Sequence, residues 1–369
     1  MARSTLPPPS WPAPAPATPQ QRRRAVLFFV LTLVSVYLVF GYQWMGGDPL
    51  TEAETAWGSL KFAATLMAIL LAHEMGHYLV ARYHGFALSL PYFLPFPFAF
   101  GTLGAVIRLK SMPKHRTALL EMGAAGPLAG FVLSIAAIAV GLPYTVDPGA
   151  IEMMVPSTPP PVEEPSAFWG ILLWPLNQLL MGLDSLLSSA GAIPEQIPDT
   201  LSVAILANPP LMDVLGILIN GEAPGRYANL DPIAFAGWVG CLLTAINLIP
   251  IGQLDGGHIL NAIQPRAASV VARVGLGALL VAGALLWPGW AVWAFLLWLM
   301  NAWLSLPVPE APTLTTRAKA IAGLTLAAFF LTVMPRPIQV EQVPLDEIRW
   351  VDEEGRPTDP PADLFREEG

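Results

Sequence analysis

The strongest constraint in this sequence is a set of long apolar runs with few or no charged residues. Residues 25–47 form an uncharged run that directly follows three arginines, Arg22 to Arg24. A helix rises about 1.5 Å per residue, so this run can cross a hydrocarbon core about 30 Å thick. The apolar core of a cleaved signal peptide needs only about 7–15 residues, so a retained membrane helix is expected here.

Similar runs recur along the chain and predict its fold class. They lie at 62–81, 122–146, 232–254, 274–309 and 320–335. The sequence Trp287-Pro288-Gly289-Trp290 interrupts the fourth of these runs, which predicts a hairpin of two helices there. The chain is therefore predicted to be all-α, a polytopic transmembrane bundle of about six to eight spans.

The composition excludes several other classes of protein. Hydrophobic residues make up 54% of the chain and charged residues only 12%. Soluble domains carry about 25% charged residues, so too few charges are present here to cover a water-facing surface. A net charge of −8 argues against binding to nucleic acid. Cys241 is the single cysteine, which excludes internal disulfides and thiolate metal clusters.

Composition and charge also divide the chain into segments. We expect a disordered Pro-rich cytoplasmic tail, two halves of a membrane domain, an extracytoplasmic or membrane-surface insert between them, and an acidic tail. The proposed ranges, in chain order, are 1–24, 25–141, 142–231, 232–336 and 337–369. Arginine and lysine favour the cytoplasmic side, which places the N-terminus there. The acidic tail is expected to be solvated and weakly ordered. Counting the predicted spans places this tail on the extracytoplasmic side of the membrane.

Two stretches do not fit a simple pattern of membrane helices. Residues 86–107 are apolar but contain three prolines, so a re-entrant or short β segment packed against protein is expected. Within the insert, 165–183 and 200–212 are apolar. We expect membrane-surface or re-entrant helices there, with a small folded external domain as the alternative.

The sequence His73-Glu74-Met75-Gly76-His77 lies inside the second predicted span. Positions i and i+4 share one face of a helix, so both imidazoles can bind one ion. Glu74 stands beside the first histidine, where it can accept a proton from water activated by the metal. A polar helix face lining a pore is the alternative, although ionisable groups inside a membrane are functional candidates by default.

A catalytic zinc needs three protein ligands and an open position for water, so a third ligand must come from elsewhere. Asp255 is the best candidate because it ends an uncharged run and precedes two glycines that permit close approach of the backbone. A helix-ending Asp-Gly turn is the alternative reading, and His258 is a competing ligand. His84 would lie about 10 Å further along the helix. The predicted ligands of Zn²⁺ are His73, His77 and Asp255.

The basic residues also predict where this site lies in the membrane. Residues 108–116 hold four basic and no acidic side chains, so this connection is expected in the cytoplasm. The second and fourth spans then both run inward. His77 and Asp255 are consequently expected near the cytoplasmic face of the membrane.

Together these motifs resemble the site-2 protease family of intramembrane zinc metalloproteases. The likeness is carried by HEMGH and by NLIPIGQLDGG at 247–257, and GTLGAVIRLKS at 101–111 and GAAGPLAGF at 123–131 add to it. It extends over 57–142 and 228–264, and is similar to the branch that includes plant thylakoid members. No segment of this sequence resembles the PDZ domain that many bacterial members carry.

The resemblance implies a zinc-dependent endopeptidase that cuts transmembrane helices of membrane-anchored substrates. It implies that His73, His77 and Asp255 bind the metal and that Glu74 is the general base. Asn247 matches a polar position that helps to hold the substrate or the oxyanion. The implied partners are a transmembrane protein substrate and the lipid bilayer, and the oligomeric state is left open. The implied location is a bacterial inner membrane.

Two other functions remain to be weighed. A zinc-binding membrane protein without peptidase activity, either a metal carrier or a pseudoprotease, would share the metal ligands. Glu74 argues against it, because a carrier has no need of a general base and pseudoproteases often lack one. A proton or ion path would need no bound metal, so stoichiometric zinc would argue against that reading.

Overall fold

A computed structural model describes residues 17–107, 115–148, 152–154, 200–300, 314–351 and 356–359. The predictions for 1–16, for 165–183 and for the last ten residues lie outside these ranges. The chain forms two compact units. The first comprises Met1–Thr145, Asn208–Pro224 and Leu230–Pro335, and the second comprises Val146–Ala207, Gly225–Asn229 and Arg336–Gly369.

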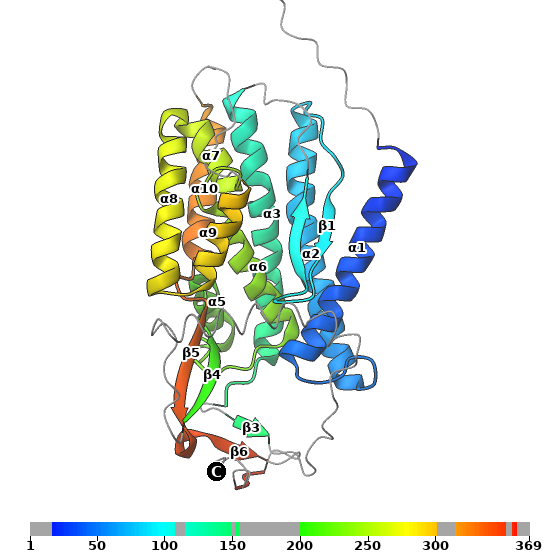
Figure 1. Cartoon of the computed structure of the whole chain (residues 1–369), viewed down its shortest axis with the longest axis vertical. Coiled ribbons are helices and arrows are strands. Elements are labelled where there is room, and N and C mark those ends of the chain that lie inside the picture. Colours follow the sequence, from blue (N-terminus) through cyan, green and yellow to red (C-terminus); the bar gives the residue numbers. More distant parts are fainter. Residues whose placement is uncertain are drawn as a thin grey trace, which may run out of the picture. The chain divides into compact units, whose positions relative to one another are not determined.

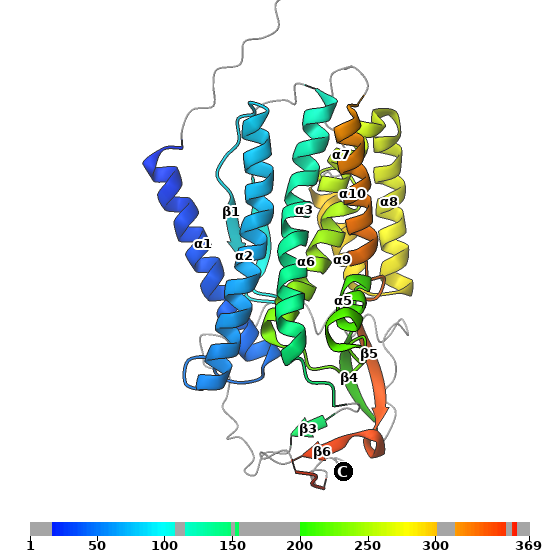
Figure 2. The same ribbon diagram turned by 180° about the vertical axis from the view of Figure 1, so that it is seen from behind.

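The first unit is a helix bundle, as Figures 1 and 2 show from two sides. Its helices are α1 (Pro19–Val39, continued by a π-helical turn Phe40–Trp44), α2 (Ala53–Tyr83), α3 (Arg116–Gly141), α5 (Pro210–Asn220), α6 (Pro232–Leu248), α7 (Asp255–Ile263), α8 (Pro265–Leu285), α9 (Gly289–Leu299) and α10 (Thr316–Thr332). Helix α3 is central, because it packs against α2, α6, α7 and α10. The predicted all-α bundle is confirmed.

Four helices of the described part are long and apolar enough to cross a membrane. They are Pro19–Trp44, Ala53–Tyr83, Arg116–Tyr144 and Pro265–Leu285. The predicted break at Trp287–Trp290 is confirmed, since α8 ends and α9 begins there. The last helix begins earlier than the apolar run does, because the Thr315 hydroxyl accepts the backbone N–H of Ala318 and caps it.

The predicted span at 232–254 is wrong over residues 249–254. Helix α6 ends at Leu248, and Ile249 has the extended backbone that a following proline favours. Pro250 then cannot supply the N–H that a continuing helix needs. Asp255 therefore begins a separate short helix, α7, rather than ending a long one.

The proline-rich stretch forms a β-hairpin, which confirms the expected short β segment. Strand β1 (Tyr92–Pro95) pairs antiparallel with β2 (Thr102–Val106). The loop between them is anchored on α1 and its π-helical turn, because Trp44 Nε1 donates to the Ala99 carbonyl at 2.8 Å and Ser35 Oγ to that of Phe96 at 3.1 Å. The hairpin is thus a fixed part of the bundle.

The second unit is built from short strands. Strand β4 (Thr200–Leu206) pairs antiparallel with β5 (Ile338–Pro344), and β3 (Glu152–Met154) pairs parallel with β6 (Arg349–Val351). A small core forms around three buried side chains, those of Val343, Ile348 and Trp350.

Two expectations are therefore wrong. Residues 200–206 are a strand rather than part of a helix, and 338–351 are ordered although the acidic tail was expected to be weakly ordered. For residues 200–206 of the insert, the alternative of a small folded domain is the better description. The physical reason is that each strand finds its hydrogen-bond partner more than 130 residues away, where local sequence gives no signal.

Candidate metal centre

Helix α2 carries His73 and His77 one turn apart on the face that packs against α3. Their Nε2 atoms lie 3.1 Å from each other, and the rings meet edge to face. Two glycines of α3 make room for them. A Cβ on Gly126 would overlap the His77 ring, and one on Gly130 would lie 3.4 Å from the His73 ring. The space beside these two glycines is filled by the imidazoles.

Asp255 completes a cluster of three potential ligands. Its Oδ2 atom lies 3.3 Å from His73 Nε2 and 3.2 Å from His77 Nε2. In a tetrahedral zinc site, metal–ligand bonds of about 2.0–2.2 Å place donor atoms roughly 3.3 Å from one another. The three donors thus have the spacing, the chemistry and the burial that a zinc ion requires. Among the described residues, His73, His77 and Asp255 are the His, Cys, Asp or Glu side chains whose donor atoms lie close enough together to share one metal ion.

The two competing ligands are not part of this cluster. His84 Nε2 donates to Glu121 Oε2 at 2.8 Å, so its ring is engaged at the end of α2. His258 lies one turn after Asp255 on α7, and its Cβ faces the backbone at Gly123. Neither histidine belongs to the group of three donor atoms.

A backbone carbonyl orients His77. The His77 Nδ1 atom lies 2.8 Å from the Met122 carbonyl oxygen of α3. A carbonyl can only accept, so Nδ1 carries the proton and Nε2 keeps a lone pair directed at the cluster. Such an outer partner fixes the tautomer and the ring orientation of a metal-binding histidine.

Short helix α7 positions Asp255, and contacts at both of its ends hold it. At its start, a Cβ on Gly256 would overlap the Leu248 carbonyl, and one on Gly257 would overlap the Gly252 carbonyl. At its end, the Arg116 guanidinium donates to the carbonyls of Ala262, at 2.6 Å, and Ile263. Those carbonyls have no partner within the helix, so the arginine both caps α7 and ties it to α3.

Sequence reasoning missed the part that Arg116 plays. It was read only as one of several basic residues that mark the cytoplasmic side. Its partners lie 146 and 147 residues further along the chain, and backbone carbonyls leave no trace in a sequence. The run of basic residues at 108–116 was a signal for topology but not for this contact.

Two predicted site residues have less structural context. Glu74 is buried, with 8% of its surface exposed, and adjoins His73 on α2. Asn247 is half-buried in the last turn of α6, and its side chain makes no hydrogen bond within the part of the chain that the structure describes. The structure brings together His73, His77 and Asp255, with Glu74 beside them.

Comparison with known proteins adds an independent observation. The model of the family described as Peptidase family M50 matches residues 61–284, more than half of the chain. An Arabidopsis thaliana protein named "Probable zinc metalloprotease EGY1, chloroplastic" is 29% identical over 287 residues, covering 75% of this chain and 43% of the relative. No solved structure matches.

Two further relatives carry similar names. EGY1 of Oryza sativa is 31% identical over 204 residues, covering 55% of this chain and 28% of the relative. EGY2 of Arabidopsis thaliana is 30% identical over 236 residues, covering 62% and 34%. The chain spans less than half the length of these curated relatives.

Proposed function

Since the chain belongs to peptidase family M50, the family of the site-2 proteases, we propose that it is a membrane-embedded, zinc-dependent endopeptidase. One observation carries this proposal. Three donor atoms from α2 and α7 meet at 3.1 to 3.3 Å inside a bundle of apolar helices. The relatives named as zinc metalloproteases support the same chemistry.

In this proposal His73, His77 and Asp255 hold the zinc ion. Bound zinc supplies Lewis acidity, which polarises a peptide carbonyl and lowers the pKa of water toward neutrality. The Glu74 carboxylate takes a proton from the attacking water and passes it to the leaving amine. The Met122 carbonyl of α3 holds the His77 ring of α2, and Arg116 of α3 holds the end of α7, so both helices that carry ligands are fixed to α3.

We propose that the substrate is a transmembrane segment of a membrane-anchored protein, cut in regulated intramembrane proteolysis. A helix hides its amides, so the substrate must be locally extended to be cut. Strand β2 pairs with β1 along one edge, and its other edge has no strand partner in the described residues. An extended substrate can add to such an edge. The alternative is that the hairpin only packs against the bundle. Asn247 is proposed to hold the substrate carbonyl.

We further propose that the site opens toward the cytoplasm. Arg82, Arg116 and Arg317 lie where α2 ends and where α3 and α10 begin, which is one end of the bundle in Figure 1. Basic residues favour the cytoplasmic side. A bacterial inner membrane is the proposed location, and the relatives named chloroplastic make a plastid membrane the alternative.

The test compares Glu74→Gln with the wild type and with Glu54→Gln, a matched change in an exposed residue at the other end of α2. Mass spectrometry of membrane fragments from cells should show peptides that appear with wild type and Glu54→Gln and vanish with Glu74→Gln. Elemental analysis should find one zinc ion per chain in all three proteins. Normal cleavage by Glu74→Gln would refute the assigned base, and zinc flux into liposomes would favour a carrier.

A further inference from the structure

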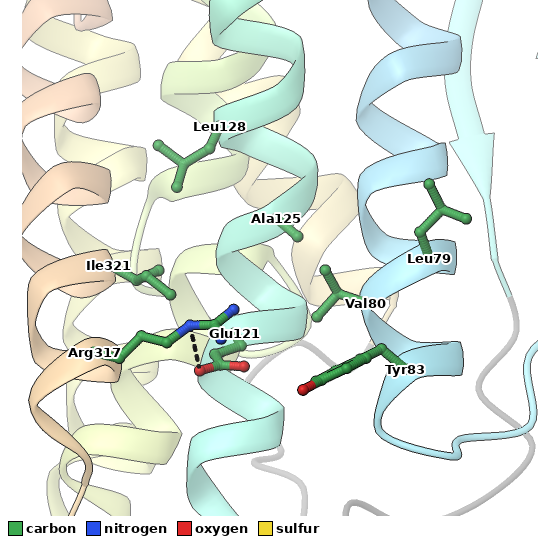
Figure 3. A pocket seen from close by; sticks show the side chains of 8 residues that line it. All are labelled: Leu79, Val80, Tyr83, Glu121, Ala125, Leu128, Arg317 and Ile321. Carbon is green, nitrogen blue, oxygen red and sulfur yellow. Dashed lines mark ion pairs between the residues drawn. The ribbon is translucent and has the colours of Figure 1, made fainter.

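A second site lies apart from the metal cluster. A cavity of about 400 Å³ is bounded by α2, α3 and α10 (Figure 3). Small-ligand sites typically have volumes of about 300–1,000 Å³. Neither the metal ligands nor the β-hairpin lines this cavity, so the proposed peptidase chemistry gives it no role.

The cavity has an apolar wall and a polar end. Val80, Ala125, Leu128 and Ile321 form the wall, and Figure 3 shows them to one side of a cluster of Tyr83, Glu121 and Arg317. This division matches a ligand with a polar head and a hydrocarbon chain.

Within the polar cluster the Arg317 side chain is exposed and the Glu121 side chain is buried. The Glu121 side chain is 8% exposed, and its two oxygens face His84 Nε2 at 2.8 Å and Arg317 Nε at 3.5 Å. The Arg317 side chain is 71% exposed. A guanidinium carries five N–H donors, and contact through Nε leaves its terminal amino groups for another partner. A ligand arriving here therefore meets an arginine rather than a carboxylate.

The surroundings of the cluster are also positive. Helices α3 and α10 both begin at this end of the bundle, so their N-termini contribute partial positive charge. Arg116 is the first residue of α3, and Arg317 is the second residue of α10. Basic pockets between helices at the cytoplasmic side of a membrane bind anionic lipid headgroups.

From these observations we propose that the cavity binds an anionic phospholipid of the surrounding bilayer. The lipid phosphate accepts hydrogen bonds from the Arg317 guanidinium and the Tyr83 hydroxyl. One acyl chain lies along Val80, Leu128 and Ile321. The lipid thereby bridges α10 to α2 and α3. This places it near the metal cluster, because α2 carries the HEMGH motif and the Ala125 carbonyl of α3 packs directly on Gly76 of that motif.

The test is native mass spectrometry of the purified full chain in detergent, titrated with phosphatidylglycerol or phosphatidylcholine. We expect phosphatidylglycerol adducts at lower lipid concentration than phosphatidylcholine adducts. Arg317→Gln should weaken phosphatidylglycerol binding about fivefold, the contribution of one basic residue near a headgroup. Arg317→Lys should keep part of the binding, because the charge remains and the planar fork is lost.

The matched control is Lys319→Gln, which removes the same charge from the same exposed turn of α10 but from a residue that does not line the cavity. It should leave lipid binding unchanged. Leu128→Trp should also reduce lipid binding, since it fills the apolar wall while Arg317 stays in place.

Several results would overturn the proposal. Equal losses in Arg317→Gln and Lys319→Gln would mean general surface attraction. Equal binding of the two lipids would remove the need for a negative headgroup. Displacement of the bound phosphatidylglycerol by millimolar inorganic phosphate alone would show that the apolar wall contributes nothing. Its displacement by a stoichiometric transmembrane peptide would assign the cavity to a protein segment instead.

Discussion

The two helices that supply the candidate metal ligands are held in opposite ways. Helix α2 has 31 residues, and its own geometry places His73 and His77 on one face. Helix α7 has nine residues and supplies only Asp255. Isolated helices shorter than about 12–15 residues are marginal in water, so α7 depends on its neighbours for its shape and place.

The site therefore depends both on the helical geometry of α2 and on contacts between residues far apart in sequence that place α7. The histidine pair survives as long as α2 is helical. The third ligand reaches the pair only if Gly256, Gly257 and Arg116 dock α7 against α6 and α3. Changes to the docking of α7 should therefore weaken metal binding without touching any ligand.

The largest effect should come from the ligands themselves, and it should not distinguish the two helices. His77→Ala and Asp255→Asn should each weaken zinc binding by at least about 100-fold, a fraction of the total binding energy of a zinc site. Competition against a chelator of known affinity measures this loss. A small loss for Asp255→Asn with a large one for His77→Ala would mean that α7 does not complete the site.

The second largest effect should come from a glycine of α7 that is in close contact with backbone, and not from a glycine on an exposed helix face. Gly256→Ala forces a methyl group onto the Leu248 carbonyl, which should lower the free energy of unfolding by about 1–3 kcal/mol and reduce zinc affinity. Gly277→Ala in α8 is the matched control, because a Cβ there meets no atom within 4 Å. The control should be neutral or slightly stabilising. Thermal unfolding with and without chelator gives both readouts.

A smaller effect should follow from the far end of α7. Arg116→Gln removes the charge-assisted bonds to the Ala262 and Ile263 carbonyls and should weaken zinc binding about tenfold, with partial recovery in Arg116→Lys. Arg266→Gln, at the start of α8, removes the same charge as a control. Loss of stability with unchanged zinc affinity would show that Arg116 supports the fold and does not position Asp255.

The smallest effect should come from another element whose place is decided by tertiary contacts, the β-hairpin. Ala99 has a positive φ of 55°, a backbone region in which a Cβ is strained. Ala99→Gly should raise stability by roughly 0.5–1 kcal/mol while keeping the bond from Trp44 to its carbonyl. The melting temperature measures this gain, and a fall would show that the Ala99 methyl group makes a packing contact worth more than the strain.

Much of the bundle and of the site could be read from local patterns. Apolar runs predicted the helices, Trp287–Trp290 predicted the break between α8 and α9, and three prolines predicted the irregular segment that forms β1 and β2. Asp255 was chosen because it ends a long uncharged run and precedes two glycines that permit close approach of the backbone. The structure brings that carboxylate to the two imidazoles.

The failures have two causes. The span at 232–254 was drawn through Pro250 because hydropathy ignores the backbone hydrogen bond that a proline cannot donate, which is a local effect. The other failures come from contacts between residues far apart in sequence. Strand β4 was read as part of a helix because its partner, β5, lies in the C-terminal segment. The cavity lined by Tyr83, Glu121 and Arg317 draws on three helices, and no single stretch contains its pattern.

Hydrophobicity and helical periodicity predict, from the sequence alone, a membrane helix bundle and one shared helix face for His73 and His77. Tertiary structure alone decided that Asp255 meets them, that Arg116 and Met122 set their geometry, and that α10 encloses a cavity with α2 and α3. The reason is physical. Periodicity is a property of neighbours along the chain, whereas a three-ligand site and a cavity are properties of packed surfaces.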